Sequence, residues 1–142
     1  MIDVNIGGTF FFSRAALPHL VESKGCIVNT ASTTAFDGLA YSVVYSATKG
    51  AVRMLTKSLA LEYAGRGVRV NAVAPGGIDT GMSNDIVFPD GADFKLILRQ
   101  MSVLNSDMQP PSVIAGVVAF LASDDAGHIT GETILVDGAA TA

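Results

Sequence analysis

Three short, mostly apolar runs, each preceded by a stretch long enough for a helix, constrain the fold of this chain more than any other feature. The runs are residues 26–31, 68–73 and 133–136. Runs of this length that are apolar at most positions indicate strands buried on both faces. Strands that alternate with helices in this way predict a parallel α/β sheet.

Four stretches between and beside these runs are expected to be helical. Residues 9–21 are apolar all round, with Pro18 near the end, and residues 42–63 repeat small or apolar side chains until glycines end the helix. A shorter helix is predicted over 92–101, after a turn. The helix through Leu121 begins at Pro110-Pro111-Ser112, because proline is tolerated in a first turn.

The composition limits the kind of protein that this can be. Of 142 residues, 49% are hydrophobic and only 15% are charged, which excludes intrinsic disorder. The length suits one domain, and no apolar run approaches the ~18 residues that span a bilayer. A net charge of -4 argues against binding to nucleic acid or to an anionic membrane, since both require a basic face.

Cysteine and histidine are scarce. The single cysteine, Cys26, cannot form an internal disulfide, and the two histidines, His19 and His128, lie far apart in the sequence. No metal site is therefore predicted. The N-terminus shows no basic segment followed by an apolar stretch, so no secretory signal is expected, and the predicted compartment is the cytoplasm.

Polar and turn-forming residues follow each predicted strand. Ser32 comes after the first, Pro75-Gly76 after the second and Asp137-Gly138 after the third. Parallel α/β sheets bind their ligands beyond the carboxyl ends of the strands. The sequence therefore predicts a site at this edge of the sheet.

Tyr45 and Lys49 are four positions apart in a predicted helix, so both side chains stand on one face. A tyrosine titrates near ~10, too high for efficient proton transfer at neutral pH, and a nearby cation favours the phenolate. Such a pair also occurs commonly on solvated surfaces. Ser32, thirteen residues upstream at a strand end, favours the catalytic interpretation because its hydroxyl can bind an oxygen that the tyrosine also contacts.

Several motifs together resemble the short-chain dehydrogenase/reductase family. The resemblance extends over essentially the whole chain, with the motifs in the family's order and spacing. The resemblance implies a Rossmann-like parallel sheet, of which the C-terminal part, three strands with their flanking helices, is present. The matching segments are Asp3-Val4-Asn5 with Gly8, Ile27–Ser32, Tyr45–Lys49, Val68–Thr80 and Ile129–Gly138.

The resemblance implies a catalytic role for four residues. Tyr45 would be the acid/base that exchanges a proton with the substrate oxygen, and Ser32 would orient and polarise that oxygen. Lys49 would bind the ribose of a nicotinamide cofactor and lower the proton affinity of the tyrosine. Asn5 would hold a water that links Lys49 to solvent.

The same resemblance implies a cofactor, NAD or NADP. Beside Tyr45 and Lys49, its binding residues would be Pro75, Gly76, Ile78 and Thr80. The implied activity is hydride transfer that interconverts a secondary alcohol and a ketone.

Part of the family pattern is missing from the sequence. No strand followed by Gly-x-x-x-Gly-x-Gly is present, and neither is the residue that chooses between NAD and NADP. Four strands are missing, a deficit on the order of 100 residues. Residues 1–142 are therefore expected to be a single partial domain, the C-terminal catalytic half without most of the cofactor-binding half. A smaller departure, expected to be harmless, is Ala139 in place of the family's usual second glycine.

Two functions stay open at this point. The chain is either part of an NAD(P)-dependent dehydrogenase or reductase, or a truncated, non-catalytic α/β remnant that acts only through packing. The helices over 9–21 and 42–63 resemble those through which family members dimerise, so a homo-oligomer is expected. Inactivity of the chain alone is also expected, because the pyrophosphate-binding element is missing.

An apolar set in the looser middle of the sequence is expected to cover the substrate, with core packing as the alternative. Because few charges accompany this set, an apolar alcohol or ketone is the predicted substrate. The set consists of Met82, Ile86, Val87, Phe88, Phe94, Leu96 and Met101.

Overall fold

The structure, a computed structural model, describes residues 1–81, 87–105 and 107–142. Its centre is a parallel three-stranded sheet of β1 (Cys26–Thr30), β2 (Arg69–Pro75) and β3 (Thr133–Val136). The strands lie in the order β1-β2-β3, so each neighbours the next along the chain. The predicted α/β class and the parallel sheet of three strands are confirmed.

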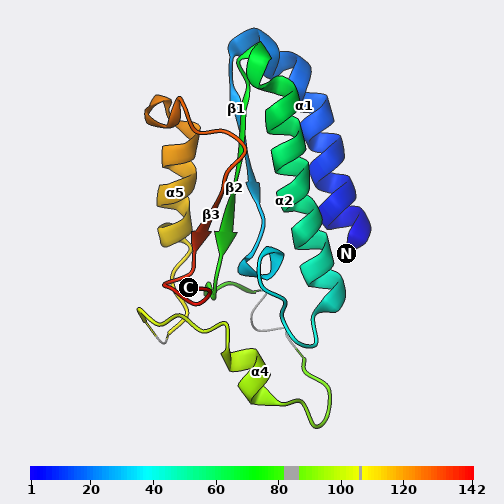
Figure 1. The fold of residues 1–142 in the computed structure, drawn as a ribbon, viewed down its shortest axis with the longest axis vertical. Coiled ribbons are helices and arrows are strands. Elements are labelled where there is room, and N and C mark those ends of the chain that lie inside the picture. Colours follow the sequence, from blue (N-terminus) through cyan, green and yellow to red (C-terminus); the bar gives the residue numbers. More distant parts are fainter. Residues whose placement is uncertain (82–86, 106) are drawn as a thin grey trace.

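Helices cover both faces of the sheet (Figure 1). The helices α1 (Thr9–Ser23) and α2 (Val43–Tyr63) lie side by side on one face, and α5 (Ser112–Ala122) packs on the other. The short helix α4 (Phe94–Leu98) lies beyond the carboxyl ends of the strands. This arrangement leaves the carboxyl edge of the sheet between α4 and the first turn of α2.

The observed bounds differ from the predicted ones mainly at helix ends. A wide helical turn over Asp3–Gly8 precedes α1, so the helical stretch begins earlier than expected. The helix α4 is shorter than the predicted 92–101. It begins after Asp93, whose carboxylate accepts a hydrogen bond from the Lys95 N–H at 2.9 Å and caps the first turn. Gly91, at φ +78°, places the backbone before it in a turn.

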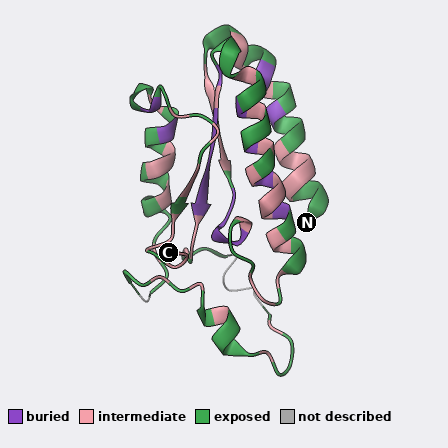
Figure 2. Cartoon of the chain, in the orientation of Figure 1, coloured by how far each residue is buried: buried purple, intermediate pink, exposed green. Residues whose placement is uncertain are grey.

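The core is built around β2, whose residues Val70 to Ala74 are all buried (Figure 2). This is the middle strand, covered by α2 on one face and α5 on the other. The edge strand β1 is only partly buried along its length. Three clusters form the core: Leu17, Ala60, Val68 and Val70; Ala31, Val52, Ala72 and Ala74; Val73, Leu121 and Ala126.

The turn after β3 carries local strain. Ala139 adopts φ +67°, a left-handed conformation that costs a non-glycine residue about 1 kcal/mol. Its N–H donates to Asp137 Oδ1 at 3.1 Å, which holds it in place. Alanine at the position where the family usually has glycine therefore stores strain in this turn.

Two absences apply to residues 1–81, 87–105 and 107–142 only. No helix there is long and apolar enough to cross a membrane. No group of three or more His, Cys, Asp or Glu side chains there is arranged to hold a metal ion.

Candidate active site

Ser32 lies directly beyond the carboxyl end of β1. The Ala31 N–H donates to the Val73 carbonyl at 2.8 Å, which extends the pairing with β2 up to the serine. Ser32 then caps a short helical turn, and its Oγ accepts a hydrogen bond from the Thr34 N–H at 3.2 Å. The side chain is buried, with 7% of its surface exposed. Ser32 is thus held in a fixed orientation at the sheet edge.

Tyr45 and Lys49 stand on one face of the first turns of α2, as the spacing predicts. The Lys49 Nζ lies 5.7 Å from the centre of the Tyr45 ring. It also donates a hydrogen bond to the Thr30 carbonyl at 2.9 Å, which joins α2 to the end of β1 two residues before Ser32. Burial lowers the pKa of Lys49, because desolvation disfavours the ammonium. The hydrogen bond to Thr30 thus holds the Lys49 amine beside the tyrosine ring.

Asn5 reaches the same helix through Thr48. Its Nδ2 donates to Thr48 Oγ1 at 3.0 Å, and that hydroxyl donates to the Tyr45 carbonyl at 2.8 Å. Thr48 is almost fully buried, at 1% exposure. It links the turn that carries Asn5 to the turn that carries Tyr45. The sequence interpretation missed Thr48, although it stands between Tyr45 and Lys49 in the motif.

Pro75 and Gly76 end β2 against the last strand. The Gly76 N–H donates to the Val136 carbonyl at 3.1 Å. A Cβ at Gly76 would lie 3.0 Å from the Cα and the Cβ of Asp137, closer than side chains normally pack. Glycine is required here because two backbone segments approach each other at the carboxyl edge of the sheet.

The segment after Gly76 is anchored on Gln109. Ile78 forms an isolated parallel bridge with it, in which the Gln109 N–H donates to the Gly77 carbonyl at 3.1 Å and the Asp79 N–H donates to the Gln109 carbonyl at 2.9 Å. Both bonds are made by the residues on either side of Ile78. In a parallel bridge of this kind, the N–H and C=O of Ile78 itself point away from Gln109. Thr80 is exposed nearby.

The structure brings the ends of β1, β2 and β3 and the first turn of α2 to one edge. Within this edge, contacts join Lys49 to Thr30 and Asn5 to α2. Convergence of the Tyr45 hydroxyl with Ser32 Oγ stays a prediction.

The apolar set predicted to cover the substrate is partly described. Phe88 and Phe94 pack edge to face, with ring centres 5.9 Å apart. Leu96 and Met101 are exposed, as is most of Val87. The other two members of the set, Met82 and Ile86, lie outside the described residues. That the set covers a substrate stays a prediction.

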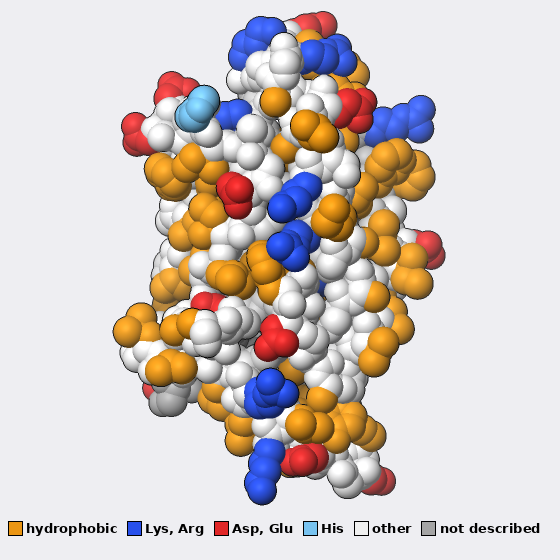
Figure 3. Space-filling model, viewed as in Figure 1, with side chains coloured by type: hydrophobic (Ala, Val, Ile, Leu, Met, Phe, Trp, Pro, Cys, Tyr) orange, Lys and Arg blue, Asp and Glu red, His pale blue; other side chains and the backbone are white. Residues whose placement is uncertain are grey.

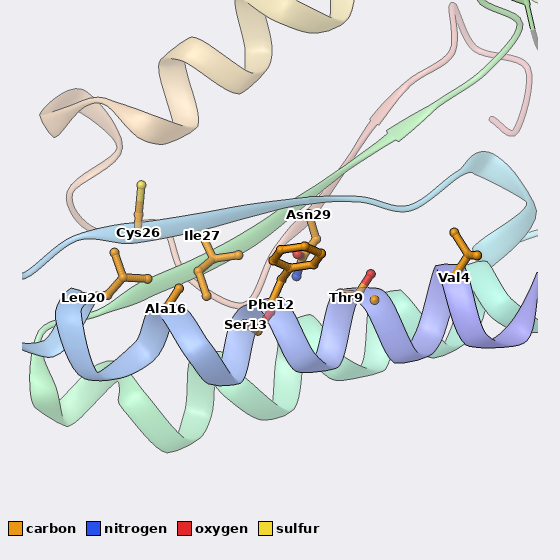
Figure 4. A pocket seen from close by; sticks show the side chains of 10 residues that line it. Val4, Thr9, Phe12, Ser13, Ala16, Leu20, Cys26, Ile27 and Asn29 are labelled. Carbon is orange, nitrogen blue, oxygen red and sulfur yellow. The ribbon is translucent and has the colours of Figure 1, made fainter.

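A groove of about 560 Å³ lies away from this edge, between α1 and β1 (Figure 4). Mostly apolar side chains line it, and Phe12 and Leu20 of α1 and Ile27 of β1 point into the space between helix and strand. The groove follows the free edge of β1 rather than Ser32 or Tyr45. It is a gap in the packing of α1, not an extension of the site.

The parallel sheet with helices on both faces is a Rossmann-like fold. The sequence profile of a family described as "Enoyl-(Acyl carrier protein) reductase" matches residues 1–141. The chain belongs to the short-chain dehydrogenase/reductase family.

Curated relatives with established names match nearly the whole chain. Meso-2,3-butanediol dehydrogenase from Serratia marcescens is 45% identical, over 98% of this chain and 53% of its own length. 3beta-hydroxysteroid dehydrogenase 1 from Eggerthella lenta is 39% identical, over 99% of this chain and 54% of its own. Glucose 1-dehydrogenase 2 from Bacillus subtilis is 37% identical, over 99% of this chain and 54% of its own length. The chain thus spans about half the length of the curated relatives that it matches.

Solved structures agree with this assignment. 4-Hydroxyisoleucine dehydrogenase complexed with NADH superposes with a TM-score of 0.81 at 32% sequence identity. The match covers 99% of this chain and 57% of that one. A mutant of that enzyme complexed with NADH and succinate gives a TM-score of 0.83 at 34% identity.

Proposed function

We propose that this chain carries the catalytic part of an NAD(P)-dependent oxidoreductase that interconverts a secondary alcohol and a ketone. The observation that supports this most is the position of Lys49, which is bound to the end of β1 and lies 5.7 Å from the Tyr45 ring centre. The names of the relatives, which act on butanediol, glucose and a hydroxysteroid, support the alcohol class. We propose an apolar alcohol as the substrate.

In this proposal Tyr45 exchanges a proton with the substrate oxygen. The amine of Lys49 lies beside the Tyr45 ring and is placed to bind the cofactor ribose next to the phenol. Ser32 donates a hydrogen bond to the same substrate oxygen, since its Oγ already accepts one from the Thr34 N–H and its own proton is directed elsewhere. Asn5 would hold a water near Lys49.

The residues present fit the nicotinamide end of a dinucleotide. Lys49 has three N–H donors, of which one goes to Thr30, so the others suit ribose hydroxyls. The N–H and C=O of Ile78, turned away from Gln109, suit a carboxamide. Tyr45, Pro75, Gly76 and Thr80 would complete the contacts. The cofactor, when bound, supplies the hydride chemistry, and the protein supplies orientation and electrostatics.

Residues 1–142 are, in this proposal, one partial Rossmann-like domain. The sequence contains no Gly-x-x-x-Gly-x-Gly to bind a pyrophosphate, and the relatives are about twice as long. We therefore expect no turnover by the chain alone. A non-catalytic remnant that acts through packing is the second candidate, and the exposure of Phe11 and Phe12 on α1 favours it.

The catalytic proposal predicts the results of two measurements, and the second of them separates it from the remnant. Calorimetric titration of the purified chain with NADH and NADPH is expected to show no micromolar binding. A chimera, in which this chain replaces the portion of the Serratia marcescens dehydrogenase that it matches, is expected to oxidise alcohols and to lose that activity in Tyr45→Phe. A folded, cofactor-binding chimera without turnover would contradict the catalytic proposal and favour the remnant.

A further inference from the structure

The loop between Ser32 and Tyr45 is fixed to α2. The Arg53 guanidinium of α2 lies 3.9 Å from the centre of the Phe36 ring, within the range of a cation–π contact. The Asp37 N–H donates to the Thr33 carbonyl at 3.1 Å, and the Ser42 N–H donates to Leu39 at 3.2 Å. The loop over residues 36–41, here called the site loop, is therefore a stable support.

The helix α4 is attached to the site loop at both of its ends. At the N-terminal end, the Asp93 N–H donates to the Tyr41 hydroxyl at 2.9 Å. At the C-terminal end, the Gln100 Nε2 donates to the carbonyls of Asp37 and Gly38, at 2.8 and 3.3 Å. The helix has five residues, none of them buried, and an isolated helix of that length is unstable in water. Its position therefore depends on contacts such as these.

The backbone of Tyr41 supports a specific role for this residue. It adopts φ +64°, the left-handed region that glycine and asparagine enter at little cost. A bulky residue in this conformation is an outlier, which persists only where the surroundings hold it. Glycine would relieve the strain but would remove the hydroxyl that binds Asp93.

The helix α4 lies beyond the carboxyl ends of the strands, at the same edge as Ser32 (Figure 1). It carries exposed apolar side chains, among them Phe94 at 60% and Leu98 at 54% exposure. Figure 3 shows hydrophobic surface at this end of the molecule. The site loop, which follows Ser32, and α4 therefore both lie at the edge of the sheet that carries the proposed active site.

We propose that Tyr41 and Gln100 are positioning residues that hold α4 against the site loop and thereby limit the size of the alcohol that reaches Tyr45. The limit on size rests on the proposed function. The attachment itself is a property of the chain that can be measured without turnover.

Hydrogen exchange of the purified chain tests the attachment. In Tyr41→Phe, which keeps the ring, amides of residues 93–98 are expected to exchange about threefold to tenfold faster, as the loss of one exposed hydrogen bond implies. Gln100→Leu is expected to act similarly. Tyr63→Phe, at the other end of α2, is the matched control and leaves these amides unchanged. Equal exchange in Tyr41→Phe and Tyr63→Phe would overturn the proposal.

Kinetics of the chimera test the limit on size. With 2-alkanols of increasing length, Tyr41→Phe is expected to lower KM for the long members by about threefold or more relative to the short ones, with kcat for the shortest alcohol within about twofold. An unchanged ratio of KM values, with faster exchange, would overturn the role in specificity. Absence of turnover in the wild-type chimera would contradict the proposed function and the size limit with it, while the exchange rates would still decide the attachment.

Discussion

The two helices on the same face of the sheet are packed very differently. From its second turn onward, the helix α2 buries one residue at every fourth position, and it packs on β2 and on the turn over Thr33–Ala35. The helix α1 buries only Ser13 and Leu17, although it carries apolar residues on all of its sides. The buried residues of α2 are Thr48, Val52, Thr56 and Ala60.

The aromatic residues of α1 show what this difference means. Phe10, Phe11 and Phe12 are 41%, 63% and 81% exposed, and the groove between α1 and β1 is lined mostly by apolar side chains. The stripe of buried residues fixes one face of α2 to the rest of the chain, while Met54 and Leu61 on its other faces are exposed. The exposed aromatic residues of α1 need a further surface to cover them. The helix that carries Tyr45 and Lys49 is thus anchored by four buried residues, whereas its neighbour is anchored by two and exposes three consecutive aromatic side chains.

The largest expected effect tests whether α2 is catalytic. Tyr45→Phe in the chimera should reduce kcat by about a thousandfold, as expected for the loss of a general acid/base. Protein stability should change little, because Tyr45 is only partly buried and keeps its ring. Tyr63→Phe on the same helix is the control and should keep full activity. Turnover in Tyr45→Phe within tenfold of wild type would exclude the assigned role.

The next effect concerns α1. We predict that the chain self-associates through this helix, and that Phe11→Ser with Phe12→Ser weakens association by about 3 kcal/mol, or roughly a hundredfold in Kd. The estimate follows from exposing two aromatic side chains that association would bury. Sedimentation equilibrium over a range of concentrations measures it.

The control for this prediction is Val103→Ser, which changes another exposed apolar residue, at 79% exposure, away from α1. It should leave the association constant unchanged. If both variants weaken association equally, the self-association is non-specific, and the contrast between α1 and α2 has no bearing on assembly.

A smaller effect tests the link between α2 and the Asp3–Gly8 turn that precedes α1. Thr48→Val keeps the shape of the side chain but leaves Asn5 Nδ2 without its acceptor. We expect a loss of about 1–2 kcal/mol in the free energy of unfolding, which is the cost of an unpaired, partly buried donor. In the chimera, kcat should fall by about fivefold to tenfold with KM nearly unchanged, since Asn5 and the Tyr45 turn would lose their common partner.

Thr48→Ser is the matched control, because it retains the hydroxyl and loses only a methyl group. It should restore kcat and most of the stability. If Thr48→Ser and Thr48→Val have the same kcat, the methyl packing of Thr48 matters and the hydrogen bonds through Asn5 do not.

Much of the fold could be predicted from the sequence, because each strand is a short apolar run between helical segments. The ends of helices were less predictable. The predicted helix over 92–101 is only Phe94–Leu98, since Asp93 forms a capping bond that hydrophobic periodicity does not reveal. The incomplete packing of α1 could not be predicted either. The hydrophobic pattern of a helix does not show which neighbouring surfaces are present to cover it.

The residues of the candidate site also divide into those that the sequence predicts and those that only the structure reveals. Tyr45 and Lys49 follow from a spacing of four, and Ser32 follows from its place after a strand. Thr48 could not be found by that spacing, because its partner Asn5 is 43 residues away in the sequence. Tyr41 and Gln100 likewise meet their partners only through the tertiary fold. Contacts between distant segments require the structure.

The smallest effect is the pH dependence that Lys49 confers on stability. Burial lowers the pKa of Lys49 in the folded chain, so between that pKa and the ordinary lysine value the unfolded state binds more protons. Stability should therefore rise as pH increases through this window, with a slope of less than one proton because the side chain is only half buried. Urea unfolding between about pH 7 and about pH 10 measures the slope. Lys49→Met should flatten it, whereas Lys57→Met, which removes an exposed lysine of the same helix, should leave the Lys49 contribution in place. An identical slope in Lys49→Met and wild type would show that the ammonium of Lys49 is as well solvated in the folded chain as in the unfolded one.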